Sequence, residues 1–123
     1  PKRVAVVDPH TWCELQLTHV IEILWSDTFN RWLTKLKDRQ AAARVLVRIR
    51  RLASGNPGDV RPVGHGVSEL RLNYGPGYRI YYLRHQDQLI LILAGGDKSS
   101  QQADITKAHE IAEHWRRTQG EFQ

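Results

Sequence analysis

The sequence is poor in the cysteines and long apolar runs that are typical of secreted and membrane proteins. Cys13 is its only cysteine, which excludes a disulfide scaffold and a metal site built from cysteines alone, and favours a reducing cytoplasm. The longest uninterrupted apolar run covers residues 89–94, whereas crossing a bilayer needs roughly 18 apolar residues. Polar side chains interrupt residues 1–17, so we expect no secretion signal there. Together these features predict a cytoplasmic protein without a membrane partner.

Composition and length also exclude several architectures. The 123 residues are 41% hydrophobic and 25% charged, close to the average of soluble globular proteins, which argues against disordered, collagen-like and coiled-coil chains. No internal repeat or low-complexity tract is present. A mass of 14.2 kDa corresponds to one domain. We assign this domain to residues 18–123 and treat residues 1–17 as an N-terminal extension of unknown role.

Positive charge is abundant and unevenly distributed. The formal net charge is +5 at pH 7 and the pI is about 9.7, which favours a polyanionic partner. Between positions 31 and 61 only Asp38 and Asp59 are acidic. The basic residues of the same stretch are Arg31, Lys35, Lys37, Arg39, Arg44, Arg48, Arg50, Arg51 and Arg61.

Hydrophobic periodicity predicts an α+β fold. Residues 20–25 are apolar and β-branched, as in a strand, and apolar residues at helical spacing predict helices over 28–38 and 40–54. Residues 67–74 and 78–84 alternate with a period of two around a Gly-Pro-Gly turn, as in a hairpin with one covered face. Residues 89–94 are apolar throughout, which predicts a central strand, and a helix follows over 101–117. We expect an antiparallel sheet of about four strands packed on the two N-terminal helices and the C-terminal helix.

The predicted hairpin brings charged side chains to one exposed face of the sheet. Glu69, Arg71, Arg79 and Tyr81 converge on this face, and Lys98 follows the next strand. Arginine holds phosphate oxygens bidentately and stays charged. Cleavage of RNA by its own 2′-hydroxyl needs such cations, a base for the hydroxyl proton and an acid for the leaving 5′ oxygen. Glu69 or Lys98 is a candidate base, and Tyr81 is a candidate proton donor or stacking platform.

Simpler interpretations of these charges stay open. Charged residues that face solvent on a hairpin commonly form weak cross-strand ion pairs. On the second predicted helix, Arg44, Arg48 and Arg51 follow i, i+4, i+7. They form either an ordinary solvated face or a contact with nucleic acid or an acidic partner. Lys37, just before this helix, is grouped with them as a candidate RNA-binding residue.

We expect no metal ion and no cofactor. The histidines are scattered, and His109 and His114 lie five apart, which fits poorly with the i, i+4 spacing of helical zinc ligands. Residues 95–100 contain Gly-Gly and Lys-Ser, but they lack the Walker spacing of a phosphate-binding loop. Cys13 has no neighbouring base that would activate it as a nucleophile.

Several short motifs are specific in combination. They include Phe-Asn-Arg-Trp-Leu-Thr-Lys-Leu-Lys-Asp at 29–38, Glu-Leu-Arg at 69–71, Gly-Pro-Gly-Tyr-Arg-Ile-Tyr-Tyr at 75–82 and Gly-Gly-Asp-Lys at 95–98, with further matches at 43–44, 48–52, 55–59 and 62–64. Over about residues 20–117 the chain resembles the addiction-module killer proteins, a phage-related, HigB-like branch of the RelE/ParE toxin superfamily. The resemblance implies the RelE/ParE-like fold.

The resemblance also implies a function. Related proteins are toxins of type II toxin–antitoxin pairs that enter the ribosomal A site and cut mRNA, which inhibits translation. A cognate antitoxin, usually a helix-turn-helix DNA-binding protein, neutralises the toxin, and the complex binds operator DNA. By position, Arg79 matches the catalytic arginine of the RelE-type enzymes, Arg71 a basic strand residue, and Lys98 the basic residue after the last strand. ParE-type relatives share the fold but inhibit DNA gyrase without cutting RNA, which is the alternative function.

Two positions depart from the RelE-type pattern. Ile105 stands in the final helix where those enzymes have a tyrosine, and Ser99 stands where they have an arginine. Some relatives use acidic or histidine side chains for proton transfer. Asp104 and Glu69 are therefore the substitutes that the resemblance suggests.

Overall fold

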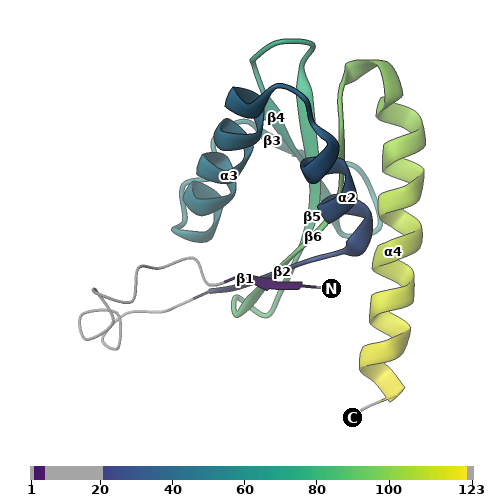
Figure 1. Cartoon of the computed structure of the whole chain (residues 1–123). Helices are drawn as coiled ribbons and strands as arrows, with labels where there is room; N and C mark the ends of the chain where they lie inside the picture. The colour runs from purple at the N-terminus through teal and green to yellow at the C-terminus, as the bar shows by residue number, and fades with distance from the viewer. Residues whose placement is uncertain (1, 5–20, 122–123) are drawn as a thin grey trace.

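The computed structural model describes residues 2–4 and 21–121, drawn in colour in Figure 1. The elements are β1 (Lys2–Val4), β2 (Glu22–Trp25), α2 (Asp27–Lys35), α3 (Arg39–Ala53), β3 (Val60–Pro62), β4 (Val67–Leu72), β5 (Tyr78–His85), β6 (Leu89–Gly96), the 3-10 helix η2 (Lys98–Ser100) and α4 (Gln101–Glu121). The strands form one sheet in the order β1-β2-β6-β5-β4-β3. β2 runs parallel to β6, and the other neighbouring strands are antiparallel.

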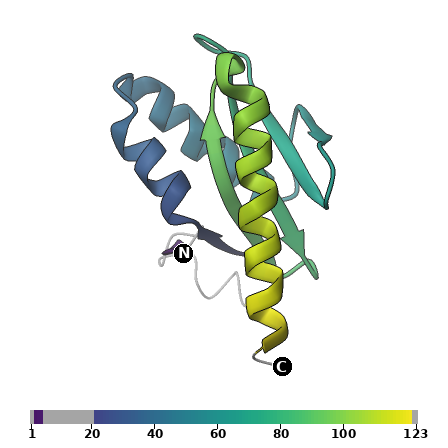
Figure 2. The ribbon, with the colours of Figure 1, turned by 90° about the vertical axis from the view of Figure 1, so that its right-hand side faces the viewer.

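The sheet lies between two helical layers (Figures 1 and 2). Helices α2 and α3 cover one face, and α4 runs across the other. Side chains along β5 point alternately to the two faces of the sheet. Ile80 packs toward α2 and α3, and Leu83 packs toward α4. On the α4 side the contact is made by Ala108 and Ala112, which let the helix approach the strands closely. Both faces of the sheet are therefore buried.

Local signals in the sequence fix the ends of the N-terminal helices. The Ser26 side chain accepts a 3.0 Å hydrogen bond from the Phe29 N–H at the start of α2, and it donates one of 2.6 Å to the Leu93 carbonyl on β6. The Asp38 side chain caps α3 in the same way. Gly55 follows α3 with a φ of 93°, a left-handed conformation that ends the helix at little cost. Ser26 thus ties helix α2 to the centre of the sheet.

The predicted α+β fold is confirmed, with two differences in the sheet. The prediction of a wholly antiparallel sheet is wrong, because β2 lies beside β6 and runs parallel to it in this sheet. The sheet has six strands rather than about four, because β1 and β3, each three residues long, are too short for a period of two to show. β1 lies within the predicted extension 1–17. The rest of that extension, with Cys13, lies outside the described residues. No helix in the described ranges has the length and apolar character needed to span a membrane.

The prediction that one face of the hairpin is exposed is wrong. Counted over whole residues, Glu69 and Tyr81 have no exposed surface and Arg79 is 7% exposed, because α4 packs over them. The strand predicted over 67–74 is therefore covered on both faces at Glu69, whereas Arg71 stays partly exposed. The alternation of charged and apolar residues that suggested a solvated face instead marks polar side chains that pair with one another inside the protein, although Nε of Arg79 has no hydrogen-bond partner.

Candidate active site

Two rows of side chains cross the sheet on the face that α4 covers. In one row, Arg71 of β4 pairs with Arg79 of β5. In the next row, Glu69 of β4 pairs with Tyr81 of β5 on one side and with Arg61 of β3 on the other. Residues two apart on a strand point to the same face. The register therefore brings all five side chains together, although they come from three strands.

The Glu69 carboxylate lies at the centre of three guanidinium groups. Its Oε1 is 3.1 Å from Nε of Arg61 and 3.4 Å from Nε of Arg71, and its Oε2 is 3.7 Å from Nε of Arg79. One buried negative charge thus faces three positive charges, an excess of two among these four groups, and the carboxyl groups of Asp97 and Asp104 lie near them. A carboxylate at this depth requires such partners, because an unpaired buried charge is strongly unfavourable.

Two neutral donors complete the partners of Glu69. The Tyr81 hydroxyl donates a 3.0 Å hydrogen bond to Oε2, and the Gln101 amide at the start of α4 donates one of 2.8 Å to the same oxygen. Burial and the neighbouring Glu69 charge raise the pKa of Tyr81 far above its usual value, so its hydroxyl keeps its proton. Gln101 ties the first turn of α4 to the arginine cluster.

The three arginines differ in how much of each side chain solvent can reach. The exposed fraction is 9% for Arg79, 35% for Arg71 and 51% for Arg61. Arg79 is held further by a 2.8 Å hydrogen bond from Nη1 to the Gly77 carbonyl. The cluster therefore has a fixed, buried end at Arg79 and an accessible end at Arg71 and Arg61, where an anion from solution can bind.

Lys98 lies beside the buried end of the cluster. It is exposed and begins η2, directly after β6. A Cβ atom at Gly77 would lie 3.3 Å from Nη1 of Arg79 and 3.7 Å from Cβ of Lys98, so both basic residues border the same turn. The structure therefore places the backbone of Lys98 next to Arg79, and its part in the site stays a prediction.

Asp104 lies at the edge of the same region, on the first turn of α4. The Ser100 hydroxyl donates a hydrogen bond to its Oδ2, and its carboxylate occupies the space that a side chain at Gly96 would fill. Burial raises the pKa of Asp104. The neighbouring Asp97 has the opposite behaviour: hydrogen bonds from Ser99 lower its pKa. Asp104 is thus a carboxyl group that holds a proton more readily than a solvated one.

The structure brings the predicted catalytic residues together, with two of them fully buried. Arg71, Arg79 and Glu69 meet directly, and Lys98 and Asp104 lie at the edge of the cluster. Tyr81 is fully buried, so it cannot serve as a stacking platform. Glu69 is also fully buried, and its two oxygens accept hydrogen bonds from Arg61, Tyr81 and Gln101, so its role as a base stays a prediction.

The sequence reasoning missed Arg61 and Gln101 as members of the cluster. Arg61 was counted only as part of the basic stretch, because β3 was not expected. The Gly-rich residues 64–66 between two extended segments are the signal that could have revealed this hairpin. Gln101 carries no comparable signal, since its contact with Glu69 depends on how α4 lies across the sheet.

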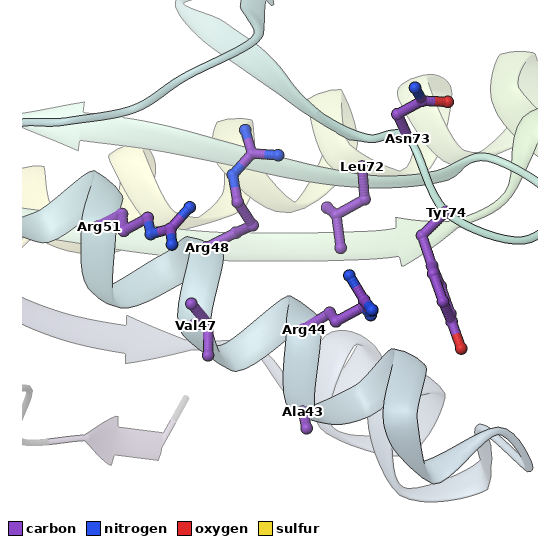
Figure 3. Close-up of a pocket in the computed structure, with 8 residues that line it drawn as sticks. All are labelled: Ala43, Arg44, Val47, Arg48, Arg51, Leu72, Asn73 and Tyr74. Atoms are coloured by element: carbon purple, nitrogen blue, oxygen red, sulfur yellow. The ribbon is translucent and has the colours of Figure 1, made fainter.

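Arg44, Arg48 and Arg51, three of the four predicted RNA-binding residues, project from α3 (Figure 3), but their guanidinium groups have different partners. Arg48 donates hydrogen bonds of 2.7 Å to the Arg71 carbonyl and 3.0 Å to the Pro57 carbonyl, so its guanidinium is committed to the backbone. Arg44 stacks on Tyr74, with the guanidinium carbon 4.3 Å from the ring centroid. Arg48 is therefore not part of an ordinary solvated face, and its contact with RNA stays a prediction.

Arg51 and Lys37 are exposed and belong to the opposite side of the sheet from the arginine cluster. Arg51 is on α3, and Lys37 lies between α2 and α3, in the helical layer opposite α4. No metal-binding group of three or more His, Cys, Asp or Glu side chains occurs among residues 2–4 and 21–121.

Comparison with protein families places the chain in one of them. The model of the phage-derived Gp49-like proteins matches residues 31–117. The chain belongs to the Gp49-like family. A Haemophilus influenzae (strain Rd) protein, described as uncharacterized, is 44% identical to this Gp49-like chain over 93 residues, which are 76% of this chain and 94% of the relative.

A solved structure supports the fold of this Gp49-like chain. It is the RelBE2 toxin–antitoxin complex from Mycobacterium tuberculosis, which matches with a TM-score of 0.51 and 22% identity over 66% of this chain and 100% of the matched chain. The predicted RelE/ParE-like fold is thus confirmed.

Proposed function

We propose that this Gp49-like protein is the toxin of a type II toxin–antitoxin pair and cuts mRNA on the ribosome. Membership of the family and the RelE-like fold support the toxin assignment. The observation that supports cleavage is the cluster of Arg61, Arg71 and Arg79 around one buried carboxylate, because its excess positive charge suits a phosphodiester.

In the proposed reaction the 2′-oxygen of the RNA attacks the adjacent phosphorus. The 2′-hydroxyl proton leaves to a base, a new bond joins the 2′-oxygen to phosphorus, and the bond from phosphorus to the 5′-oxygen breaks. The products are a 2′,3′-cyclic phosphate and a 5′-hydroxyl end. Arg71, at the accessible end of the cluster, neutralises the charge that grows on the phosphorus oxygens, and the buried Arg79 beside it adds its positive charge. This is the task that a metal ion performs in other nucleases.

Proton transfer belongs to the edge of the cluster rather than to its centre. Asp104 suits the general acid, because burial raises its pKa and brings it closer to neutral pH. Lys98 is the exposed basic group next to Arg79 and suits either the base or a phosphate contact. Glu69 orients the three arginines instead of exchanging protons.

The proposal includes partners. A cognate antitoxin, expected to be a helix-turn-helix DNA-binding protein, would neutralise the toxin, as the paired chains of the RelBE2 complex suggest. The complex would bind operator DNA. The ribosome and its mRNA would be the targets in the cytoplasm.

Purified protein added to a cell-free translation system tests the proposal. We expect translation to stop and primer extension to show cut mRNA on ribosomes. Arg79→Ala should lower cleavage by at least about 100-fold, the loss typical when a group that stabilises transition-state charge is removed. Arg84→Ala is the matched control, because Arg84 lies on the same strand and pairs with Asp87 at the surface.

Intact mRNA together with inhibition of gyrase-catalysed supercoiling would overturn cleavage and favour the ParE-like alternative. Normal cutting by Arg79→Ala would instead overturn the assignment of the site. Growth of cells that express the chain, without any arrest, would overturn the toxin assignment itself.

A further inference from the structure

We propose that the groove between α3 and the residues at the end of β4 is a docking site for an acidic, amphipathic segment of a protein partner. The groove has a volume of about 340 Å³. Its lining residues are Ala43, Arg44, Val47, Arg48, Arg51, Leu72, Asn73 and Tyr74 (Figure 3). The existence of a neutralising partner rests on the proposed function, whereas the location and chemistry of the site rest on this groove.

The first argument is the pattern along α3. Arg44, Val47 and Arg51 follow one another at i, i+3 and i+7, so an apolar side chain lies between two guanidinium groups on one stripe of the helix. Seven residues of helix span about 10 Å. A complementary segment therefore carries two carboxylates about two helical turns apart with an apolar side chain between them.

The second argument is exposure and charge. Val47 is 46% exposed and Leu46, which precedes it on α3, is 38% exposed; they are the two exposed large hydrophobic residues among the described residues. Helix α3 contains no acidic residue, and its basic residues are Arg39, Arg44, Arg48, Arg50 and Arg51. An exposed apolar side chain surrounded by positive charges is complementary to a partner segment whose apolar side chain is flanked by negative charges.

The groove is also largely pre-formed. Arg48 is fixed by its bonds to two backbone carbonyls, and the Arg44 guanidinium lies over Tyr74. The Tyr74 hydroxyl is in turn 3.3 Å from Oδ2 of Asp38 and 3.2 Å from Oε1 of Gln40. Binding therefore requires little ordering of these side chains, which favours affinity.

A protein segment fits this groove better than RNA does. Single-stranded RNA binds proteins largely by stacking bases on exposed aromatic rings. Tyr74 is the one aromatic residue of the lining, and Arg44 already covers its ring. The remaining uncharged lining side chains are Ala43, Val47, Leu72 and Asn73, of which only Asn73 can hydrogen-bond a base edge.

The groove and the arginine cluster lie on opposite faces of the sheet. Leu72 of the groove belongs to the core beneath α2 and α3, whereas Tyr81 of the cluster belongs to the core beneath α4. Binding at the groove can therefore be measured separately from cleavage at the cluster.

Selection from a display library of random peptides about 16 residues long, using the immobilised full-length protein, tests the proposal. We expect enriched peptides to carry Asp or Glu at a spacing of seven, with an apolar residue between them. A labelled consensus peptide is then titrated in fluorescence anisotropy. Its binding should weaken at least about tenfold with Arg44→Glu/Arg51→Glu and with Val47→Asp, and stay unchanged with Arg50→Glu, a control on α3 outside the groove lining.

Reversing the charges of the peptide as well tests the groove even if the substitutions also affect the folding of the variant. The same peptide with Lys at both acidic positions should bind Arg44→Glu/Arg51→Glu better than it binds the wild type. Failure to enrich acidic peptides, or equal loss of binding in Arg50→Glu, would overturn the proposal. Displacement of the peptide by a single-stranded oligo(U) RNA of about 12 nucleotides, with RNA binding lost in the same groove variants, would also overturn it and assign the groove to RNA.

Failure of the proposed function gives a different pattern. Wild-type protein that selects acidic peptides but neither cuts mRNA nor arrests growth would contradict the toxin assignment and leave the docking site standing. Protein that cuts mRNA without selecting acidic peptides would contradict the docking site alone. Arg79→Ala should bind the consensus peptide as the wild type does, because Arg79 lies on the other face of the sheet.

Discussion

The Tyr81 hydroxyl donates a 3.0 Å hydrogen bond to Oε2 of Glu69, and both side chains are fully buried between the sheet and α4. Tyr81 belongs to β5 and Glu69 to β4, at directly paired positions. The same carboxylate holds Arg71 and Arg79. A buried polar pair therefore sets the orientation of the guanidinium groups that are proposed to bind phosphate, and this dependence can be measured.

Glu69→Gln should destabilise the protein strongly. The substitution keeps the shape of the side chain but removes the negative charge that three guanidinium groups share, which is expected to cost about 3 kcal/mol of the free energy of unfolding. Tyr81→Phe removes one donor and leaves Gln101 on the same oxygen, so it should cost only about 1 kcal/mol. Urea unfolding monitored by circular dichroism gives both values.

Glu113→Gln is the control for this comparison. Glu113 lies on α4 with a 60% exposed side chain and pairs with Arg117 at 3.9 Å in solvent. Such a pair contributes little, so its loss should leave the urea midpoint unchanged. A Glu69→Gln protein as stable as the Glu113→Gln protein would show that the buried carboxylate does not organise the cluster.

Stability should fall at alkaline pH because of Tyr81. Burial and the Glu69 charge raise its pKa in the folded protein above the value of about 10 expected in the unfolded chain. The unfolded chain therefore loses this proton first. The contribution to stability is complete below about pH 10 and is lost as the pH rises above it.

Urea unfolding at a series of pH values from neutral to alkaline measures this loss. Burial also raises the pKa values of Tyr78 and Tyr82, so the wild type should lose stability through all three residues. Tyr81→Phe should show a shallower decline than the wild type. Identical alkaline slopes for the two proteins would refute the assignment to Tyr81.

Gly96→Ala should disturb the site through Asp104. The new methyl group would occupy the space of the Asp104 carboxylate, so the carboxylate must move away from Ser100 and the end of β6. Such overpacking is expected to cost about 1–3 kcal/mol of stability. Cleavage of mRNA should fall as well, because the proposed general acid is displaced.

The double variant Gly96→Ala/Asp104→Ala separates the two effects. Removing the Asp104 carboxylate relieves the clash, so the costs of the two changes should not add. Stability should recover relative to Gly96→Ala, whereas cleavage should stay low. Additive losses of stability would show that Asp104 does not lie against Gly96.

The sequence predicts the helices well because their signals are local. The apolar face of α3 and the Asp38 cap at its start are both visible in the order of residues. β3 was missed because it has three residues, one of them Pro62, and no periodicity can be detected over that length. Because β3 is not predicted, Arg61 is not predicted to lie in the site either.

Burial of the site was mispredicted for a different reason. A row of ion-paired side chains inside a protein has the same alternation as a solvated strand, so the sequence around Glu69 and Arg71 does not distinguish the two. What decides between them is α4, whose small residues Ala108 and Ala112 allow it to lie over the sheet. That packing depends on the tertiary fold, as does the contact from Gln101 to Glu69.

Arg48 should matter for stability in a way that its neighbour Arg50 does not. Arg48 bridges α3 to the Arg71 carbonyl on β4 and the Pro57 carbonyl in the loop before β3. Each of these charge-assisted bonds contributes about 1.5–3 kcal/mol, so Arg48→Ala should lower the free energy of unfolding by at least about 2 kcal/mol.

Arg48→Lys tests whether the planar guanidinium group, which can donate to both carbonyls at once, is required. A lysine ammonium is a single point charge and cannot hold both carbonyls in the geometry of a guanidinium, so this variant should recover only part of the loss. Arg50→Ala, on the exposed side of α3, should unfold at the urea concentration of the wild type. Equal midpoints for Arg48→Ala and Arg50→Ala would mean that the bridge to β4 does not contribute to stability. The guanidinium of Arg48 would then be available to a partner in the groove, and the fixed position assigned to it there would be wrong.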